Sequence, residues 1–388
     1  MAGQPLRILF ASPAWWPATS FGGPVAVGRE LTARLVARGH AVSVLTTALV
    51  DLHAAPARRT REASDGGVRV RYLATPLRYR WMGITPTLPL ELLRARRPDV
   101  LHVFGFRDPV TTGAAAWARL RRVPYVFEPL GMFRPRLRKV ALKRLLDSTV
   151  YRGIAQGAAA VVVSSELERD DVIAGGVDRE RIHVRGNGFP APYDVEPADR
   201  AELGIPEGAP VVLYVGRLAA GKGIEHLLAA LRVLPDAHLV LVGPDDGHGV
   251  ARSLGGERVH VLPPTDGPPL RLYRLADVLA LPSQGESFGL AAAEAAAAGT
   301  PVVVSERCGV AACFREGEAL VVPYGEAALT AALERVLADG ELRRRLAAGA
   351  LEAARRSSWE AVAERQEQVY RLAVASRTAA SRFSTDGP

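Results

Sequence analysis

Short apolar runs alternate with stretches of helical periodicity along most of the 388-residue chain. The first unit is an apolar run at 7–13, a helical stretch at 25–39 and a second apolar run at 41–47. Three more apolar runs follow in the first half, at 99–105, 124–129 and 159–165. This alternation is typical of parallel sheets built from strand–helix–strand units. The first half is therefore predicted to form one α/β domain.

A second series of apolar runs begins after 186–210, a stretch rich in proline and acidic residues whose composition is typical of a linker. The runs lie at 211–216, 238–243, 258–264, 278–283 and 301–305, and helices are expected to begin near Gly223, Pro269, Gly289 and Glu326. We therefore predict two Rossmann-like, doubly wound α/β domains that face each other across a cleft.

The predicted domain boundaries follow from these two series. Residues 1–190 form the N-terminal domain and 191–362 the C-terminal domain. The last stretch, 363–388, continues an amphipathic helix that is expected to pack back on the N-terminal domain. Ligands of doubly wound sheets bind beyond the carboxyl ends of the strands, so the loops that follow the apolar runs are the candidate site.

The composition limits the location of the protein and its partners. Hydrophobic residues make up 48% and charged residues 23% of the chain, and no apolar stretch reaches the roughly 18 residues of a membrane span. We expect a cytoplasmic protein. The net charge of +8 suits nucleic acid, an anionic membrane or an anionic substrate. Nucleic acid is not expected, because the chain has no zinc-finger, helix-turn-helix or aromatic-interleaved basic motif.

Part of the positive charge is concentrated at 134–144, which holds six cations and no acid. Two interpretations stay open. The run is a solvated helix face, as charge runs usually are, or it attracts anionic lipid head groups or a phosphate-bearing acceptor. The second would give the protein peripheral contact with the inner face of the membrane.

A glycine-rich stretch, "VGRLAAGKGIEHLL", follows the first apolar run of the second half. Gly216 to Lys222 has the spacing of a nucleotide-hydrolase P-loop, a Gly, four residues, then Gly-Lys. A P-loop continues with a Ser or Thr that binds magnesium, and this chain has Gly223. A P-loop ATPase therefore remains an alternative that lacks one of its ligands. Arg217 and Lys222 still indicate that an anion binds here.

Two glutamates flank the helix expected near Gly289. Glu286 precedes this helix, and Glu294 falls one to two turns inside it. The backbone N–H groups of Phe288, Gly289 and Leu290 are expected to point outward at the helix start, where they would suit an anion. A nucleotide sugar offers the matching groups: sugar hydroxyls, a diphosphate and a ribose.

The stretch 285–305, "GESFGLAAAEAAAAGTPVVVS", resembles the signature of retaining glycosyltransferases with two Rossmann-like domains, the GT-B fold. More specifically, it is similar to glycosyltransferase family 4, the group 1 glycosyl transferases. The signature is a Glu, seven residues, a second Glu, then Gly-x-Pro and a strand. The similarity extends through "LYVGRLAAGKGIEHLL", "LADVLALPS" and the late Trp359, and so covers most of the chain.

The resemblance implies roles for individual residues. Glu286 would be catalytic and hold the donor sugar near its reacting carbon, and Glu294 would accept hydrogen bonds from the ribose hydroxyls of a UDP- or GDP-linked sugar. Arg217 and Lys222 would neutralise the diphosphate as it leaves. Two glycines of the first half, Gly22 and Gly23, would allow close approach to the donor phosphate or the acceptor, with a plain tight turn as the alternative.

Two residues of the first half are candidates for the acceptor side. His102, at the end of a predicted strand, could orient an acceptor hydroxyl or act as a base. Many relatives carry a histidine two residues later, where this chain has Phe104, so a histidine satisfied within the core is the alternative. Glu128 is predicted to contact the acceptor.

No metal cofactor is expected, because the chain contains no Asp-x-Asp and because Arg217, Lys222 and the helix amides can neutralise the diphosphate. The prediction is a retaining, hexosyltransferase-type glycosyltransferase acting on a glycan or lipid-linked acceptor in cell-envelope or exopolysaccharide assembly. A catalytically silent sugar-nucleotide-binding subunit and a hydrolysing nucleotide-sugar epimerase are further alternatives.

Overall fold

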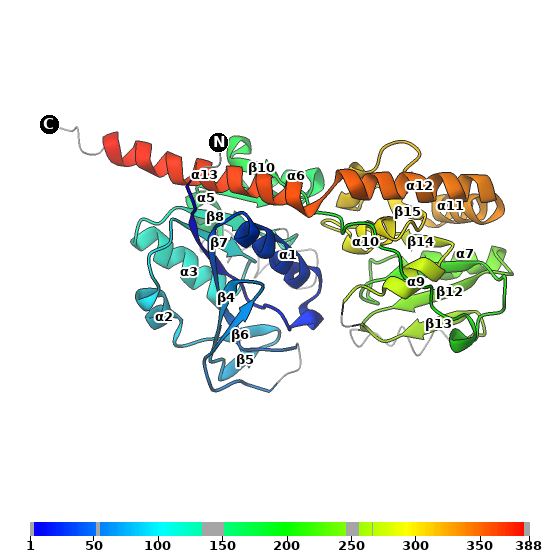
Figure 1. The fold of residues 1–388 in the computed structure, drawn as a ribbon, viewed down its shortest axis with the longest axis horizontal. Coiled ribbons are helices and arrows are strands. Elements are labelled where there is room, and N and C mark those ends of the chain that lie inside the picture. The colour runs from blue at the N-terminus through cyan, green and yellow to red at the C-terminus, as the bar shows by residue number, and fades with distance from the viewer. Residues whose placement is uncertain (1–3, 52–54, 134–150, 246–255, 266, 384–388) are drawn as a thin grey trace. The chain divides into compact units, whose positions relative to one another are not determined.

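The computed structural model describes residues 4–51, 55–133, 151–245, 256–265 and 267–383. It forms two compact units, each built around its own sheet (Figure 1). The N-terminal unit comprises Met1–Gly186 together with Trp359–Pro388, and the C-terminal unit comprises Asn187–Ser358. The chain therefore returns to the first unit after it completes the second.

The N-terminal unit contains an eight-stranded sheet. Its strands are β1 (Arg7–Ala11), β2 (Ala41–Thr47), β3 (Arg61–Asp65), β4 (Val68–Leu73), β7 (Val100–Phe104), β8 (Tyr125–Glu128), β9 (Ala160–Val163) and β10 (Ile182–Val184). Their order is β10-β9-β8-β7-β1-β2-β4-β3, and all neighbours run parallel except the edge strand β3, which is antiparallel to β4. A separate hairpin pairs β5 (Leu77–Tyr79) with β6 (Met82–Ile84).

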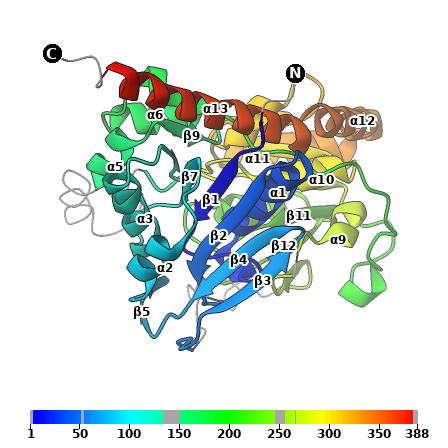
Figure 2. The ribbon, with the colours of Figure 1, turned by 60° about the vertical axis from the view of Figure 1, so that its left-hand side comes forward.

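Helices cover both faces of this sheet. They are α1 (Gly23–Ala37), α2 (Leu88–Arg94), α3 (Pro109–Leu120), α5 (Arg152–Gly157), α6 (Glu166–Ala174) and α13 (Trp359–Phe383). Successive strand residues point to opposite faces. Leu101 and Val103 of β7 pack in the core that contains α3, whereas His102 between them meets Tyr370 of α13. Helix α13 runs beside α1 on that second face (Figure 2).

The C-terminal unit contains a six-stranded, fully parallel sheet. Its strands are β11 (Val211–Val215), β12 (His238–Val242), β13 (Val259–Leu262), β14 (Val278–Leu281), β15 (Val302–Ser305) and β16 (Leu320–Val322). Their order, β13-β12-β11-β14-β15-β16, is the 3-2-1-4-5-6 order of the Rossmann fold. The order reverses between β11 and β14, and the loops after these two strands therefore flank the usual ligand position.

The helices of the C-terminal unit are α7 (Ile224–Val233), α9 (Leu270–Leu275), α10 (Leu290–Ala297), α11 (Glu326–Ala338) and α12 (Gly340–Arg356). Helix α10 contacts α9 and α12 and packs on β14 and β15. Five of its eight residues are buried alanines, Ala292, Ala293, Ala295, Ala296 and Ala297. A helix buried on most sides is apolar all round, and its small side chains let it approach the sheet closely.

The structure confirms most of the predicted elements. Every apolar run singled out in the sequence is a strand, and the helices expected near Gly223, Pro269, Gly289 and Glu326 begin at Ile224, Leu270, Leu290 and Glu326. No individual expectation covered β3, β4, the β5–β6 hairpin, β10, β16, α2, α3, α5, α6 or α12. The two unit boundaries, Gly186 and Ser358, each fall four residues before the predicted positions 190 and 362.

The interpretation of 186–210 as a linker is wrong for most of that stretch. From Asn187 onward it belongs to the C-terminal unit. Phe189 is 1% exposed and lies in the core of that unit, and the backbone N–H of Tyr193 donates to the carbonyl of Ala297 (3.2 Å). A few apolar side chains fix the segment on the domain although its overall composition is that of a loop.

Two further expectations concern the membrane. Among the described residues, none of the helices combines the length and the apolar character that crossing a bilayer requires. The cationic run 134–144 lies outside the described residues.

Candidate functional site

The loop after β11 is held against the end of β12. The backbone N–H of Gly216 donates to the carbonyl of Val242, and that of Leu218 donates to the carbonyl of Pro244, both at 2.9 Å. Arg217 lies between these two anchors, and its side chain is exposed. The loop therefore has a fixed backbone and presents a cation to solvent at the carboxyl edge of the sheet.

Gly223 closes this loop and begins α7 as its N-terminal cap, in the left-handed conformation with φ of 75°. A Cβ atom at this position would lie 2.2 Å from the carbonyl oxygen of Pro282. Pro282 directly follows β14, and its backbone atoms cannot move away as a flexible side chain can. The structure therefore leaves no room for the Ser or Thr that a P-loop needs, which argues against the ATPase alternative.

The loops after β11 and β14 meet at the switch point of the sheet. The backbone N–H of Gln284 donates to the carbonyl of Gly221 (2.8 Å). The ammonium group of Lys222 forms an ion pair with Oε2 of Glu286. Both side chains are partly exposed, Lys222 at 19% and Glu286 at 28%. A cation and a carboxylate thus lie together, within reach of solvent, where Rossmann-type sheets bind their ligands.

The backbone of Glu286 is fixed by the segment that follows β15. Its N–H donates to the carbonyl of Arg307 (3.1 Å), and its carbonyl accepts from the N–H of Gly309 (3.0 Å). This short bridge holds the main chain in place, while the side chain carries the ion pair with Lys222. The fixed backbone and partly exposed carboxylate suit a group that positions a substrate.

Phe288, Gly289 and Leu290 lead into α10, which begins at Leu290. Gly289 is the N-terminal cap, with φ of 105°, and a Cβ there would lie 2.9 Å from Leu281 Cδ2. The Phe288 ring is buried and meets Phe189 edge-on, with ring centroids 6.3 Å apart. Of the three residues, only Leu290 belongs to the helix itself, and the anion-binding role of their amides stays a prediction.

Glu294 lies in the second turn of α10 and is held by two tyrosines. Oε2 of Glu294 accepts a hydrogen bond from the hydroxyl of Tyr273 (2.7 Å). The hydroxyl of Tyr193 donates to the Glu294 carbonyl (2.6 Å). Burial raises the pKa of Glu294 to about 7, and the bond from Tyr273 opposes that rise. Sequence analysis missed both tyrosines, because no spacing rule pairs residues from three separate elements.

Gly22 and Gly23 form the start of α1 in the N-terminal unit. Gly22 is the helix cap, with φ of 81°, and a Cβ at this position would meet nothing within 4 Å. The conformation favours glycine, while the surrounding space is open. The backbone could thus be approached closely here, and the tight-turn interpretation fits the same geometry.

His102 and Glu128 belong to a buried cluster, defined here as His102, Glu128, Arg185, Gln366 and Tyr370. Nε2 of His102 lies 3.1 Å from Oε2 of Glu128, and Nδ1 lies 2.6 Å from the hydroxyl of Tyr370. The two terminal nitrogens of Arg185 donate to the two carboxylate oxygens of Glu128, each at 2.8 Å. Nη1 of Arg185 also donates to Gln366 (3.1 Å).

This geometry corrects the roles predicted for His102 and Glu128. Their side chains are 0% and 1% exposed, so neither is placed to touch an acceptor in this structure. Burial lowers the pKa of His102. Burial acts in the opposite direction on Glu128, but Arg185 and His102 outweigh it and hold the pKa of Glu128 below its usual value. The alternative of a histidine satisfied within the core is the one that the contacts support.

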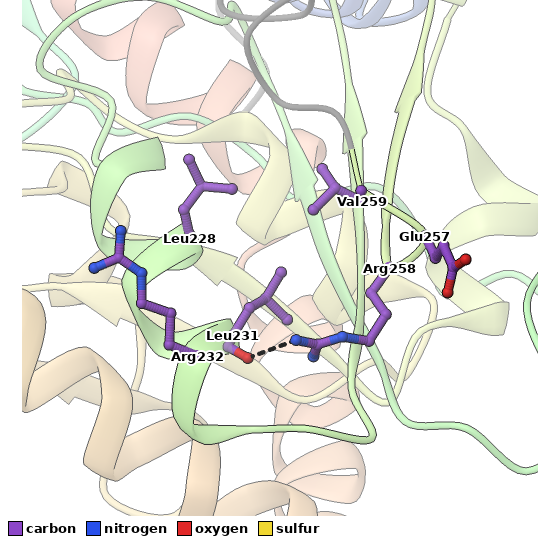
Figure 3. A pocket seen from close by; sticks show the side chains of 7 residues that line it. Leu228, Leu231, Arg232, Glu257, Arg258 and Val259 are labelled. Atoms are coloured by element: carbon purple, nitrogen blue, oxygen red, sulfur yellow. Dashed lines mark hydrogen bonds between the residues drawn. The ribbon is translucent and has the colours of Figure 1, made fainter.

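A hollow in the C-terminal unit lies away from these loops (Figure 3). Its volume is about 350 Å³, and it is lined by Leu228, Leu231, Arg232, Gly256, Glu257, Arg258 and Val259. Nη2 of Arg258 donates to the Leu231 carbonyl (3.1 Å) across it. These residues belong to the last turns of α7 and to the start of β13. The hollow is therefore at the amino edge of the sheet, opposite the Lys222–Glu286 pair.

The candidate site residues divide between the two units. Arg217, Lys222, Glu286, Phe288, Gly289, Leu290 and Glu294 lie in the C-terminal unit, and Gly22, Gly23, His102 and Glu128 lie in the N-terminal unit. In the part of the chain that the structure describes, no three His, Cys, Asp or Glu side chains are grouped so as to hold a metal ion.

The two parallel sheets and the charged loops at the switch point place the protein in the GT-B class of two-domain α/β proteins. Two family models match the chain, "Glycosyl transferases group 1" over residues 195–353 and "Glycosyl transferase 4-like domain" over residues 22–188. The chain belongs to this glycosyltransferase family, as the sequence resemblance had implied.

Individual relatives agree with this assignment. The chain is 37% identical over 249 residues to D-inositol 3-phosphate glycosyltransferase of Xylanimonas cellulosilytica, and the match covers 58% of this chain and 60% of that protein. The matched part thus spans about three fifths of that relative's length.

Solved structures cover more of the chain. Sucrose-phosphate synthase of Thermosynechococcus elongatus has a TM-score of 0.72 and 27% identity, and the match covers 96% of this chain and 100% of that one. The catalytic domain of starch synthase IV of Arabidopsis thaliana has a TM-score of 0.76 at 17% identity, with the same coverage. These structures show that the two-domain fold extends over nearly the whole chain.

Proposed function

We propose that the protein is a retaining glycosyltransferase that moves a sugar from a nucleoside diphosphate donor to a hydroxyl group of an acceptor. The observation that carries this proposal is the Lys222–Glu286 pair at the switch point of the C-terminal sheet. Family membership supports the reaction class. The pair supplies what a nucleotide sugar needs: a cation for the diphosphate and a carboxylate for sugar hydroxyls.

The reaction places different demands on these groups. The bond between the sugar carbon and the phosphate oxygen breaks, and a new bond forms to the acceptor oxygen on the same face. The acceptor's proton passes to the leaving diphosphate. Negative charge grows on that diphosphate as the bond breaks, so fixed cations at Lys222 and Arg217 stabilise the transition state more than the ground state. Glu286 orients the sugar.

Glu294 is proposed to bind the ribose of the donor. Its carboxylate is anchored on one oxygen by Tyr273, which leaves the other oxygen available to accept hydrogen bonds from paired hydroxyls. The donor base is proposed to be uracil or guanine. We propose that the reaction needs no metal, because Lys222 and Arg217 provide the positive charge that a divalent ion would otherwise supply.

The acceptor is proposed to be a polyhydroxylated compound. The relative from Xylanimonas cellulosilytica is named for D-inositol 3-phosphate, and this compound is the first acceptor to test. A glycan or lipid-linked acceptor of cell-envelope or exopolysaccharide assembly, as expected from the sequence, is the second.

The first experiment measures thermal stability of the full chain with UDP, GDP, ADP or ATP, each with chelator and with magnesium. A ligand at a hundred times its dissociation constant stabilises by about 2.7 kcal/mol. We expect a shift with UDP or GDP that survives chelator. A shift that requires ATP and magnesium would overturn the proposed donor class.

The second experiment measures transfer. The matching nucleotide sugar is incubated with each acceptor, and the released nucleoside diphosphate and the glycosylated product are quantified. Product formation supports the enzyme, and the anomeric configuration of the product decides whether the reaction retains it. Binding without any turnover would instead support the catalytically silent subunit.

A further inference from the structure

An exposed patch lies at the C-terminal ends of α2 and α3, which pack side by side in the N-terminal unit (Figure 1). It is defined by Leu93, Arg97, Leu120, Arg121 and Arg122 and is called here the α2–α3 patch. Four of these residues, all but Leu93, line a hollow of about 570 Å³ together with Leu92, Ala95 and Trp117. The patch lies near the starts of β7 and β8, at the amino edge of the sheet, and so is away from the carboxyl-edge loops.

The apolar part of the patch is unusually exposed for a packed helix pair. Leu120 is 84% exposed and Leu93 is 59% exposed. A single exposed leucine needs no explanation in a folded protein. Leu120 lines the hollow beside the arginines, and Leu93 lies on the helix that packs against α3, so each helix of the pair exposes a large apolar side chain that solvation alone does not favour.

The polar part of the patch consists of the three arginines Arg97, Arg121 and Arg122. The side chains of Arg97, Arg121 and Arg122 are exposed, and no acidic residue is among the described residues that line the hollow. One Arg97 nitrogen donates to the Arg121 carbonyl (3.1 Å), which is the favourable contact of a cation with a helix end. That contact uses one donor of one guanidinium and gives no reason for three arginines.

We propose that the α2–α3 patch docks the protein on an anionic lipid surface. The leucines insert among the acyl chains at the interface, and the arginines contact the phosphate groups of the lipids. Neither the leucines nor the arginines suffice alone, because a few apolar side chains or a few cations give weak and reversible membrane binding. Exposed apolar side chains together with cations match a bilayer interface, whereas a nucleic-acid backbone would need the cations alone.

The patch is distinct from the cationic run 134–144, which is the other candidate for the same partner. The run holds six cations and three large apolar residues, Leu137, Val140 and Leu142. Because the two candidates differ in residues, variants that each remove three arginines can separate them. The proposal does not rest on the proposed function, since lipid binding is measured without any sugar donor.

The experiment is flotation of the full-length protein with neutral phosphatidylcholine vesicles and with vesicles of phosphatidylcholine and phosphatidylglycerol. Three charge-matched variants are compared. The patch variant is R97Q/R121Q/R122Q, the run variant is R136Q/R138Q/R144Q, and the control is R232Q/R344Q/R345Q on exposed helix positions of the C-terminal unit. A fourth variant, L93S/L120S, removes the apolar part and keeps every charge.

We expect the unaltered protein to bind the anionic vesicles only, and to bind more weakly as salt is raised. The patch variant should lose binding by on the order of a hundredfold, from three cations near the surface. L93S/L120S should also bind more weakly, and the control should bind normally. The patch variant, L93S/L120S and the control should melt as the unaltered protein does, because their changed side chains are exposed. Absence of anionic vesicle binding would overturn the proposal, and so would loss confined to the run variant.

Discussion

Lys222 and Glu286 form an ion pair that joins the loop after β11 to the loop after β14. The pair lies where the strand order of the C-terminal sheet reverses, and both side chains remain partly exposed. A partly exposed pair stabilises a protein by little, about 1 kcal/mol or less. The position of the pair at the switch point, rather than its contribution to stability, therefore indicates a role in ligand binding. A nucleotide sugar would replace the internal pair with its own diphosphate and hydroxyls.

Glu286→Gln is expected to fold normally and to lose most of the transfer activity, on the order of a hundredfold or more. The amide keeps the shape but not the charge, which balances Lys222 and is proposed to orient the donor sugar. Steady-state transfer and thermal melting are measured on the same preparation. The matched control is Glu225→Gln, an exposed glutamate in the first turn of α7. Near-unaltered activity of Glu286→Gln would remove Glu286 from the mechanism.

Gly223→Ser is expected to destabilise the protein strongly and to produce no ATPase. Both φ of 75° and the carbonyl of Pro282, 2.2 Å from where a Cβ atom would lie, oppose a side chain. Gly204→Ser is the control, since Gly204 has the similar φ of 68° but nothing within 4 Å. The control measures backbone strain alone, about 1 kcal/mol. In denaturant unfolding, we expect Gly223→Ser to lose at least about 2 kcal/mol more unfolding free energy than Gly204→Ser. Equal losses in the two variants would contradict the steric argument.

The pH dependence of stability should change in Glu294→Gln. Burial raises the pKa of Glu294 from 4.5 to about 7, so the folded state keeps a proton that the unfolded state releases. The unaltered protein therefore loses stability as pH rises from about 4.5 to 7, by up to about 3 kcal/mol from this group. Glu294→Gln lacks that loss, because an amide does not titrate in this range.

The measurement is the melting temperature of both proteins between pH 5 and 8. The difference between them should widen in favour of Glu294→Gln as pH rises and level off above about 7. Tyr273→Phe removes the hydrogen bond that lowers the pKa of Glu294. In Tyr273→Phe, the pH above which the stability loss from Glu294 levels off should therefore be higher. If the difference in melting temperature between the unaltered protein and Glu294→Gln stays constant with pH, the pKa of Glu294 is not raised.

Glu128→Gln is expected to cost about 3–5 kcal/mol of unfolding free energy, because it leaves the buried Arg185 guanidinium without its counter-charge. The double variant E128Q/R185M should recover part of the loss by removing that charge. The control is Glu352→Gln, which breaks a surface pair with side chains 62% and 59% exposed and should change stability by about 0.5 kcal/mol or less. Equal losses in Glu128→Gln and Glu352→Gln would contradict the buried-charge argument.

The sequence determined the repeating architecture of this protein. Parallel strands buried on both faces are continuous apolar runs, and several stretches between them have helical periodicity, so the α/β alternation and most of the sheet strands could be predicted. The Gly-rich loop and the glutamate pair could be predicted too, because their spacing is local. Even the misfit of Gly223 with a P-loop was visible, although its steric reason was not.

Tertiary structure alone decided which distant residues meet. The contacts of Glu294 with Tyr273 and Tyr193 join α10 with α9 and with the loop after β10. The cluster around Glu128 joins β7, β8 and α13 with Arg185 after β10. The tertiary structure buries His102 and Glu128, which argues against contact of either side chain with an acceptor, and it adds residues 187–190 to the C-terminal unit. Local periodicity reports which face of an element is apolar, but not which partner covers that face. Burial and partner choice are properties of the packed chain, and they decide whether a polar residue binds a substrate or supports the fold.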